Sequence, residues 1–107
     1  MANPKAIIAK HTTEAEFQAD IVAFAKAHGW MVHAERPART SKGWATPIQG
    51  DAGFPDLVLA RNGYRIFAEV KSEKGRLTAM QKVWADELRF VKIWRPSQWD
   101  EIKERLE

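Results

Sequence analysis

The chain has 107 residues, of which 45% are hydrophobic and 29% are charged, a composition typical of one small globular domain. It contains no cysteine, which excludes disulfides, cysteine-ligated zinc, iron–sulfur clusters and thiolate nucleophiles. Lysine and arginine number 17 against 14 aspartate and glutamate residues, and the net charge of +3 permits a polyanionic partner without requiring one.

The N-terminal third predicts a flexible leader, a helix and a strand. Residues 1–12 carry no signal-peptide pattern, and no apolar run approaches the roughly 20 residues of a membrane span, so we expect a cytoplasmic protein. We expect one folded domain over 13–107. Thr13 and Glu16 form a capping box that opens a helix over 14–28, with Gly29 as its C-cap. Residues at helical spacing share one face of it: Phe17, Ile21, Phe24, Ala25 and His28. A short strand over 30–34 follows.

Residues 35–54 stand out because they contain two prolines and three glycines and show no hydrophobic periodicity. A loop of this length without regular structure is usually functional or mobile. It carries three cations and an aromatic ring that suit contacts with DNA phosphates and bases: Arg36, Arg39, Lys42 and Trp44. The alternative is a solvated loop with no ligand.

The remainder alternates strands and helices. Residues 55–60 and 64–71 predict two strands joined at Asn62-Gly63, a dipeptide typical of tight hairpins. Thr78 and Gln81 form a second capping box before a helix whose apolar residues are Met80, Val83, Trp84 and Leu88. Residues 90–94 predict a last strand, and Pro96-Ser97 begins a third helix, with Trp99, Ile102 and Leu106 facing inward. The order α-β-β-β-α-β-α indicates an α/β domain with a mixed sheet.

Three charged residues of the hairpin can meet on one sheet face. Glu69 and Lys71 lie two apart on a strand and therefore point to the same side. Asp56 begins the neighbouring antiparallel strand. Magnesium is typically held by one or two carboxylates together with water and substrate phosphate, and such an ion lowers the pKa of bound water. The grouping therefore suits phosphodiester hydrolysis, with Lys71 orienting the attacking water.

A surface ion pair between Glu69 and Lys71 is the main alternative, because exposed pairs of this kind are common. Phe67 shares their face and argues against full solvation. Glu14 is a third carboxylate candidate, since it lies three before Phe17 and projects from the core-facing side of the first helix. Glu16 projects elsewhere and serves the cap. Gln81 also has a capping role that competes with a site role.

The three histidines show no metal-ligand spacing. We expect His28 to be partly buried, and His33 ends a strand near the loop, where it could contact substrate.

Two segments carry a resemblance to a known family: GFPDLVL at 53–59 and AEVKSEKGRL at 68–77, followed by Gln81. They resemble the VRR-NUC family, the virus-type replication-repair branch of the PD-(D/E)XK nuclease superfamily. The resemblance extends back to residues 13–18 and forward through 94–96 to the last helix. It implies a restriction-endonuclease-like αβββαβ core and DNA cleavage that depends on Mg²⁺ or Mn²⁺ and leaves a 5′-phosphate.

The resemblance also implies site residues and an assembly. Catalytic positions would be Glu14, Asp56, Glu69 and Lys71, with Gln81 as an accessory, and the metal ligands Asp56, Glu69 and the Val70 carbonyl. Lys74 and Arg76 of the same motif join the candidate DNA contacts. Small members resemble Holliday-junction resolvases, which act as homodimers in DNA repair, and five tryptophans in so short a chain favour an interface.

One feature departs from the family pattern. Residues 84–88 run almost directly into 89–91 without a helix-stopping glycine. A connection this short is strained, and strained hinges are a route to exchange of C-terminal elements between two copies. Three other interpretations stay open: a DNA-binding module without catalysis, an α/β interaction domain, and a monomeric flap or nick nuclease.

Overall fold

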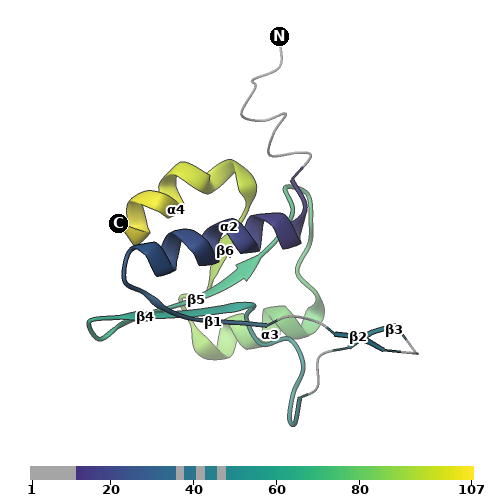
Figure 1. The fold of residues 1–107 in the computed structure, drawn as a ribbon. Helices are drawn as coiled ribbons and strands as arrows, with labels where there is room; N and C mark the ends of the chain where they lie inside the picture. Colours follow the sequence, from purple (N-terminus) through teal and green to yellow (C-terminus); the bar gives the residue numbers. More distant parts are fainter. Residues whose placement is uncertain (1–11, 36–37, 41–42, 46–47) are drawn as a thin grey trace.

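The computed structural model describes residues 12–35, 38–40, 43–45 and 48–107. Its main sheet has four strands in the order β1-β4-β5-β6. Strands β1 (Met31–Ala34), β4 (Leu57–Arg61) and β5 (Tyr64–Val70) pair antiparallel, whereas β6 (Lys92–Trp94) runs parallel to β5. Helices flank this mixed sheet on both sides (Figure 1). The predicted α/β class is confirmed, and the arrangement is consistent with a restriction-endonuclease-like fold.

The hydrophobic core lies between the sheet and two helices. Helix α2 (Glu14–Ala27) and helix α4 (Trp99–Leu106), which follows the short 3₁₀ turn η1 (Pro96–Gln98), cover the same face of the sheet (Figure 1). The predicted helix faces are confirmed by their buried members, which are Phe17, Ile21, Ala25, Ile102 and Leu106. Strand residues of alternating positions complete the core: Leu57, Leu59, Ile66, Ala68 and Val70. Alternation along β4 and β5 therefore leaves their other side chains on the opposite face.

The ends of α2 and the hairpin follow from local signals. The Thr13 hydroxyl accepts a hydrogen bond from the Glu16 N–H at 3.1 Å and donates one to Glu16 Oε1 at 2.9 Å. Gly29 follows the C-cap residue His28 with φ of +84°. Asn62 and Gly63 both have positive φ, as the tight turn between β4 and β5 requires. These turns are placed where the sequence predicts them.

The segment expected as an irregular loop contains regular structure. Strands β2 (Ala38–Thr40) and β3 (Gly43–Ala45) pair antiparallel within it and form a second, two-stranded sheet, which extends away from the main sheet in Figure 1. The expectation of a structureless 35–54 segment is therefore wrong. Strands of three residues carry too few side chains to show an alternation in sequence.

Helix α3 (Ala79–Leu88) lies on the other side of the sheet from α2 and α4 (Figure 1). The predicted capping box is present: Thr78 Oγ1 accepts from the Gln81 N–H, and Gln81 Oε1 accepts from the Thr78 N–H. None of its side chains is buried, however, and Met80 and Val83 are exposed. The helix is confirmed, but its predicted apolar face is right only in part, because Trp84 and Leu88 are half-buried while Met80 and Val83 lie exposed.

The connection after α3 is strained, as its missing glycine suggests. Arg89 has φ of 58° with ψ of 156°, and Phe90 has φ of 54°. Residues other than glycine rarely adopt these backbone dihedral angles, and each residue held there destabilises the folded state by about 1–3 kcal/mol. Phe90 is 91% exposed and precedes the last strand, so the predicted strand over 90–94 begins two residues later, at Lys92.

The Arg89→Gly variant tests this strain. Glycine adopts the observed dihedral angles without strain, which stabilises the folded chain, but it also increases the conformational entropy of the unfolded chain. We expect the free energy of unfolding to rise by about 1 kcal/mol after both effects. Arg89→Ala, which removes the side chain but keeps Cβ, serves as the control. Equal urea midpoints for the two variants would contradict the assignment of strain.

Candidate active site

The sheet register brings Asp56 and Glu69 together. Leu57 pairs with Ala68, so one step further along the same antiparallel pair sets Asp56 opposite Glu69. Side chains of directly opposed residues lie on the same face of a sheet. The Asp56 carboxylate accepts a hydrogen bond from the Val70 N–H at 2.8 Å, which holds it against β5. The predicted proximity of these two carboxylates is therefore confirmed.

Glu69 is a buried carboxylate without a partner. Its side chain is 1% exposed, and among the described residues neither Oε1 nor Oε2 meets a hydrogen-bond donor. Burial, reinforced by the charge of Asp56, raises the pKa of Glu69 to about 8. A buried, unpaired carboxylate destabilises the folded state by several kcal/mol, and in proteins such a group usually takes up a proton or lies beside a cation. A proton satisfies Glu69 below its raised pKa, and a cation held beside Asp56 would do so once that proton is lost.

Asp56 has a mixed environment. Burial raises its pKa most, while the Val70 N–H and the charge of Lys71 act in the opposite direction, and Glu14 raises the pKa further. Lys71 is 8% exposed, and its N–H donates to the Trp94 carbonyl at 3.0 Å, which anchors the end of β5 to β6. The interpretation of Glu69 and Lys71 as a solvated surface pair is wrong, because both side chains are buried.

Glu14 and Glu16 are both exposed, unlike the predicted core-facing Glu14, and they make different contacts. Glu14 Oε1 accepts a hydrogen bond from the Ser72 N–H at 3.3 Å, directly after Lys71. Glu16 is bound to the Thr13 hydroxyl in the cap. A Cβ atom on Gly75 would lie 2.9 Å from Ser72 Oγ and 3.3 Å from Glu14 Oε1, so a larger residue there would have to displace these side chains. Glu14, although exposed, therefore reaches the end of β5 where the other charged groups gather.

Arg95 is a positioning residue that the sequence did not single out. One of its guanidinium nitrogens donates to the carbonyls of Ser72, Glu73 and Gly75, at 2.7, 3.3 and 2.7 Å. The Ser97 N–H also donates to the Glu73 carboxylate at 3.1 Å. These bonds fix the loop that receives Glu14. Because β5 and β6 are parallel, the residues that follow each strand meet at one edge, and this is the signal that could have identified Arg95.

Glu35 is a second residue that the sequence analysis missed. It directly follows β1, and its N–H donates to the Asp56 carbonyl at 3.0 Å. Burial, followed by the charge of Asp56, raises the pKa of Glu35, and His33 lowers it. The register of Ala34 with Leu57 extends by one step to set Glu35 opposite Asp56. Only that pairing reveals it, because 20 residues separate the two in sequence.

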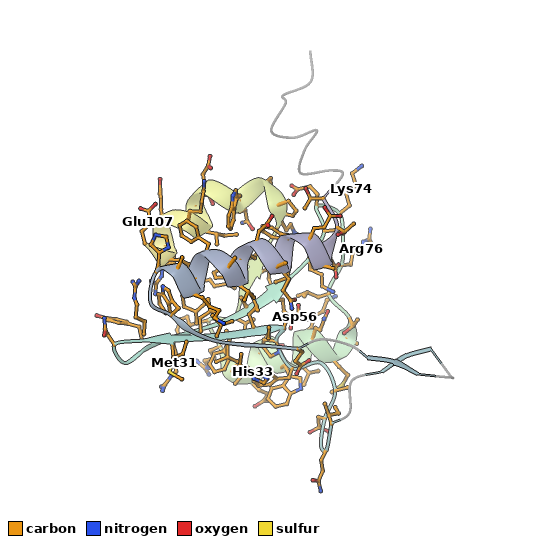
Figure 2. All side chains as sticks on the ribbon, in the orientation of Figure 1. Met31, His33, Asp56, Lys74, Arg76 and Glu107 are labelled. Carbon is orange, nitrogen blue, oxygen red and sulfur yellow. The ribbon has the colours of Figure 1, made fainter. Side chains whose placement is uncertain are left out.

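The remaining candidates lie further from this centre or serve other contacts. Gln81 uses Oε1 in the cap of α3. His33 is exposed on β1 (Figure 2). His28 is also exposed, with its ring stacked on Phe24 at 4.1 Å between centroids, so the prediction that it is partly buried is wrong.

The predicted DNA contacts fall into three groups. Lys74 and Arg76 are exposed in the loop after β5, close to the first turn of α2 (Figure 2). Arg39 and Trp44 are opposed in the register of β2 and β3. Arg36 and Lys42 lie outside the described residues.

The donor set fits a hard divalent cation. Among the described residues, no three His, Asp or Glu side chains are grouped closely enough to hold a metal ion by themselves. Magnesium needs fewer protein ligands, since water and substrate phosphate complete its coordination. The two unpartnered oxygens of Glu69 beside Asp56 supply the oxygen ligands that such an ion prefers.

Comparison with known proteins agrees with this geometry. The family model of the VRR-NUC domain matches residues 4–93, which include every carboxylate described above. None of the curated proteins matches the chain. No helix within the described ranges has both the length and the apolar character needed to cross a bilayer.

Proposed function

Because the chain belongs to the VRR-NUC domain family, which implies a nuclease-type function with DNA as substrate, we propose that it is a divalent-metal-dependent endonuclease acting on branched DNA. The observation that carries the metal dependence is Glu69, whose buried oxygens have no partner within the described part of the chain. Asp56, Glu69 and the Val70 carbonyl would hold Mg²⁺ or Mn²⁺. The bound ion would lower the pKa of a water molecule and offset the charge that builds on the phosphate.

The other residues act on the water and on the phosphate. Lys71 is buried beside the two carboxylates, where its ammonium lowers the pKa of both. An ammonium in this position orients an attacking hydroxide and stabilises the negative charge of the transition state. Glu14, held by the Ser72 N–H, completes the acidic group at the end of β5.

We propose that the protein is a homodimer, in which the two active sites cut two symmetry-related strands of a four-way junction. Exposed apolar side chains on and after α3 support this proposal: Met80, Val83 and Phe90. Apolar patches on small domains often mark protein interfaces, and twofold dimers are the commonest oligomers. Light scattering over a range of concentrations, without DNA, tests the assembly. A mass that stays at that of one chain would overturn the dimer and favour nicking of flaps.

The substrate assay uses four DNA structures: a four-way junction, a flap, a nicked duplex and a linear duplex, each with Mg²⁺, Mn²⁺ or EDTA. We expect cleavage of branched DNA with either metal and none in EDTA. The Lys71→Ala variant should lose most of its rate while DNA affinity changes little, because the role of Lys71 belongs to the transition state. Metal-independent binding of all four DNAs without cleavage would instead identify a DNA-binding module.

A paired substitution of Glu14 and Glu16 tests the assigned carboxylate. We expect Glu14→Gln to lower the cleavage rate by about 10–100-fold, the loss typical of groups that support a metal centre. Glu16→Gln, two residues away, is the matched control and should keep nearly the full rate, because Glu16 contacts Thr13. Single-turnover kinetics with saturating enzyme measure both, and the reverse order would show that the wrong carboxylate was chosen.

A further inference from the structure

The sheet face that carries Asp56 and Glu69 continues into a cluster of aromatic rings. Phe67 lies two residues before Glu69 on β5, so both side chains leave the sheet on the same face. The ring of Phe54 packs edge-to-face against Phe67, at 6.1 Å between centroids, and against Trp84 of α3, at 5.1 Å. The aromatic cluster of Phe54, Phe67 and Trp84 therefore adjoins the two carboxylates.

A cavity opens beside this aromatic cluster. Its volume is about 630 Å³, within the roughly 300–1,000 Å³ of sites that bind small ligands. Phe54 and Trp84 line it, and its other lining residues are Glu35 and the loop over 48–53. The Glu35 N–H donates to the Asp56 carbonyl at 3.0 Å, so one wall of the cavity is hydrogen-bonded to a residue of the proposed metal site. DNA held at that site would bring a neighbouring nucleotide to the cavity.

Hydrogen bonds and close packing hold the walls of the cavity in place. Trp84 Nε1 donates to the Ala52 carbonyl at 3.0 Å, which fastens α3 to the loop. Gly53 has φ of +96°, and a Cβ atom on it would lie 2.7 Å from the carbonyl carbon of Met80. A side chain at this position would push the loop away from the first turn of α3, so glycine keeps the two in contact. A cavity whose walls are already ordered loses less entropy when it binds a ligand.

The lining suits a nucleobase better than a phosphate. Among the described residues that line the cavity, none is a lysine or an arginine, whereas Glu35 and Asp51 are acidic. Carboxylates repel phosphates but accept hydrogen bonds from the amino groups of bases, as they do from cytosine. Aromatic side chains stack on bases of any sequence. The ring of a base and its amino group therefore match both the apolar and the acidic part of the lining.

We propose that the cavity beside Phe54 and Trp84 binds an unpaired base of the DNA substrate, next to the bond that is cut. The inference rests on the proposed function and supplies a physical reason for its preference for branched DNA. A base inside a duplex must first be unpaired and unstacked, whereas a base that is already unpaired enters a protein pocket at a lower cost. Flaps, and junctions at their branch point, supply such bases, and an intact linear duplex does not.

Binding to DNA with and without the unpaired base tests the inference. The DNA is an end-labelled flap whose first unpaired nucleotide carries either the fluorescent base 2-aminopurine or no base. The protein is the Glu69→Gln variant, in which we expect no cleavage, and fluorescence anisotropy gives its Kd. We expect the abasic flap to bind about tenfold more weakly, the loss typical of one stacked base. The fluorescence of 2-aminopurine should be quenched on binding, because the base stacks on an aromatic ring.

Two further substitutions locate the base. Trp84→Leu, added to Glu69→Gln, should weaken binding of the 2-aminopurine flap by about tenfold and leave binding of the abasic flap unchanged. Trp99→Leu is the matched control, because it makes the same change on α4, on the other side of the sheet (Figure 1). It should bind both flaps as Glu69→Gln does. Circular dichroism of each variant checks that it is folded.

The outcomes separate the two proposals. Equal Kd values of Glu69→Gln for the two flaps would overturn the inference, whether or not Trp84→Leu folds. An equal loss on both flaps in Trp84→Leu would also overturn it, since Trp84 would then act only on the structure. Cleavage by the wild-type chain with Mg²⁺ is measured beside these data. If the flap is cleaved but binding ignores the base, the cavity proposal fails and the proposed function stands. If binding depends on the base and no DNA is cleaved, the proposed function fails and the base site stands.

Discussion

Glu69→Gln should abolish cleavage and at the same time stabilise the metal-free protein. Glutamine keeps the shape of the side chain but is a poor ligand for a hard cation, so the rate should fall by more than about 100-fold, beyond the loss typical of supporting residues. Near pH 8 glutamine also avoids the free-energy cost that is linked to the raised pKa of Glu69, which is on the order of 4 kcal/mol for a shift from 4.5 to about 8. Single-turnover cleavage and urea unfolding measure the two effects.

Asp56→Asn provides the comparison. It should lose cleavage equally, because it removes the other carboxylate of the pair. The gain in stability from Asp56→Asn should be smaller, because the Val70 N–H donates a hydrogen bond to the Asp56 carboxylate and already stabilises its ionised form. If both variants cleaved DNA at the wild-type rate, the assigned site would be wrong. A loss of activity accompanied by lower stability would indicate a structural role instead.

Most of the fold could be predicted because its signals are local. Thr13, Gly29 and the Asn62-Gly63 turn act through hydrogen bonds and dihedral angles within a few residues of themselves. The pair of Glu69 and Lys71 on one face needs only the twofold period of a strand. Asp56 required one further step, the tight turn, which fixes the register of β4 with β5.

The rest depended on contacts between distant segments. Glu35 comes to lie beside Asp56 only through the pairing of β1 with β4, because residues 36–55 separate the two in sequence. Arg95 acts through the parallel pairing of β6, which no local pattern encodes. The exposure of Met80 and Val83 is likewise a tertiary property, because spacing says which residues share a helix face and not what covers that face.

The stability of the metal-free protein should fall as the pH rises from about 5 to about 8. Glu69 has a pKa of about 8 in the folded chain against 4.5 for the ordinary group, so within this window the folded chain holds a proton that the unfolded chain has released. The free energy of unfolding therefore decreases with pH, and the raised pKa of Asp56 acts in the same direction. Urea unfolding in EDTA at several pH values measures the slope, with Glu69→Gln as the control that lacks this titration. Mn²⁺ should restore stability most at the upper end of the window, because it occupies the place that the proton leaves and binds only the folded chain. Equal slopes for wild type and Glu69→Gln would mean that Glu69 is already charged and paired in the folded protein, and its need for a cation would then disappear.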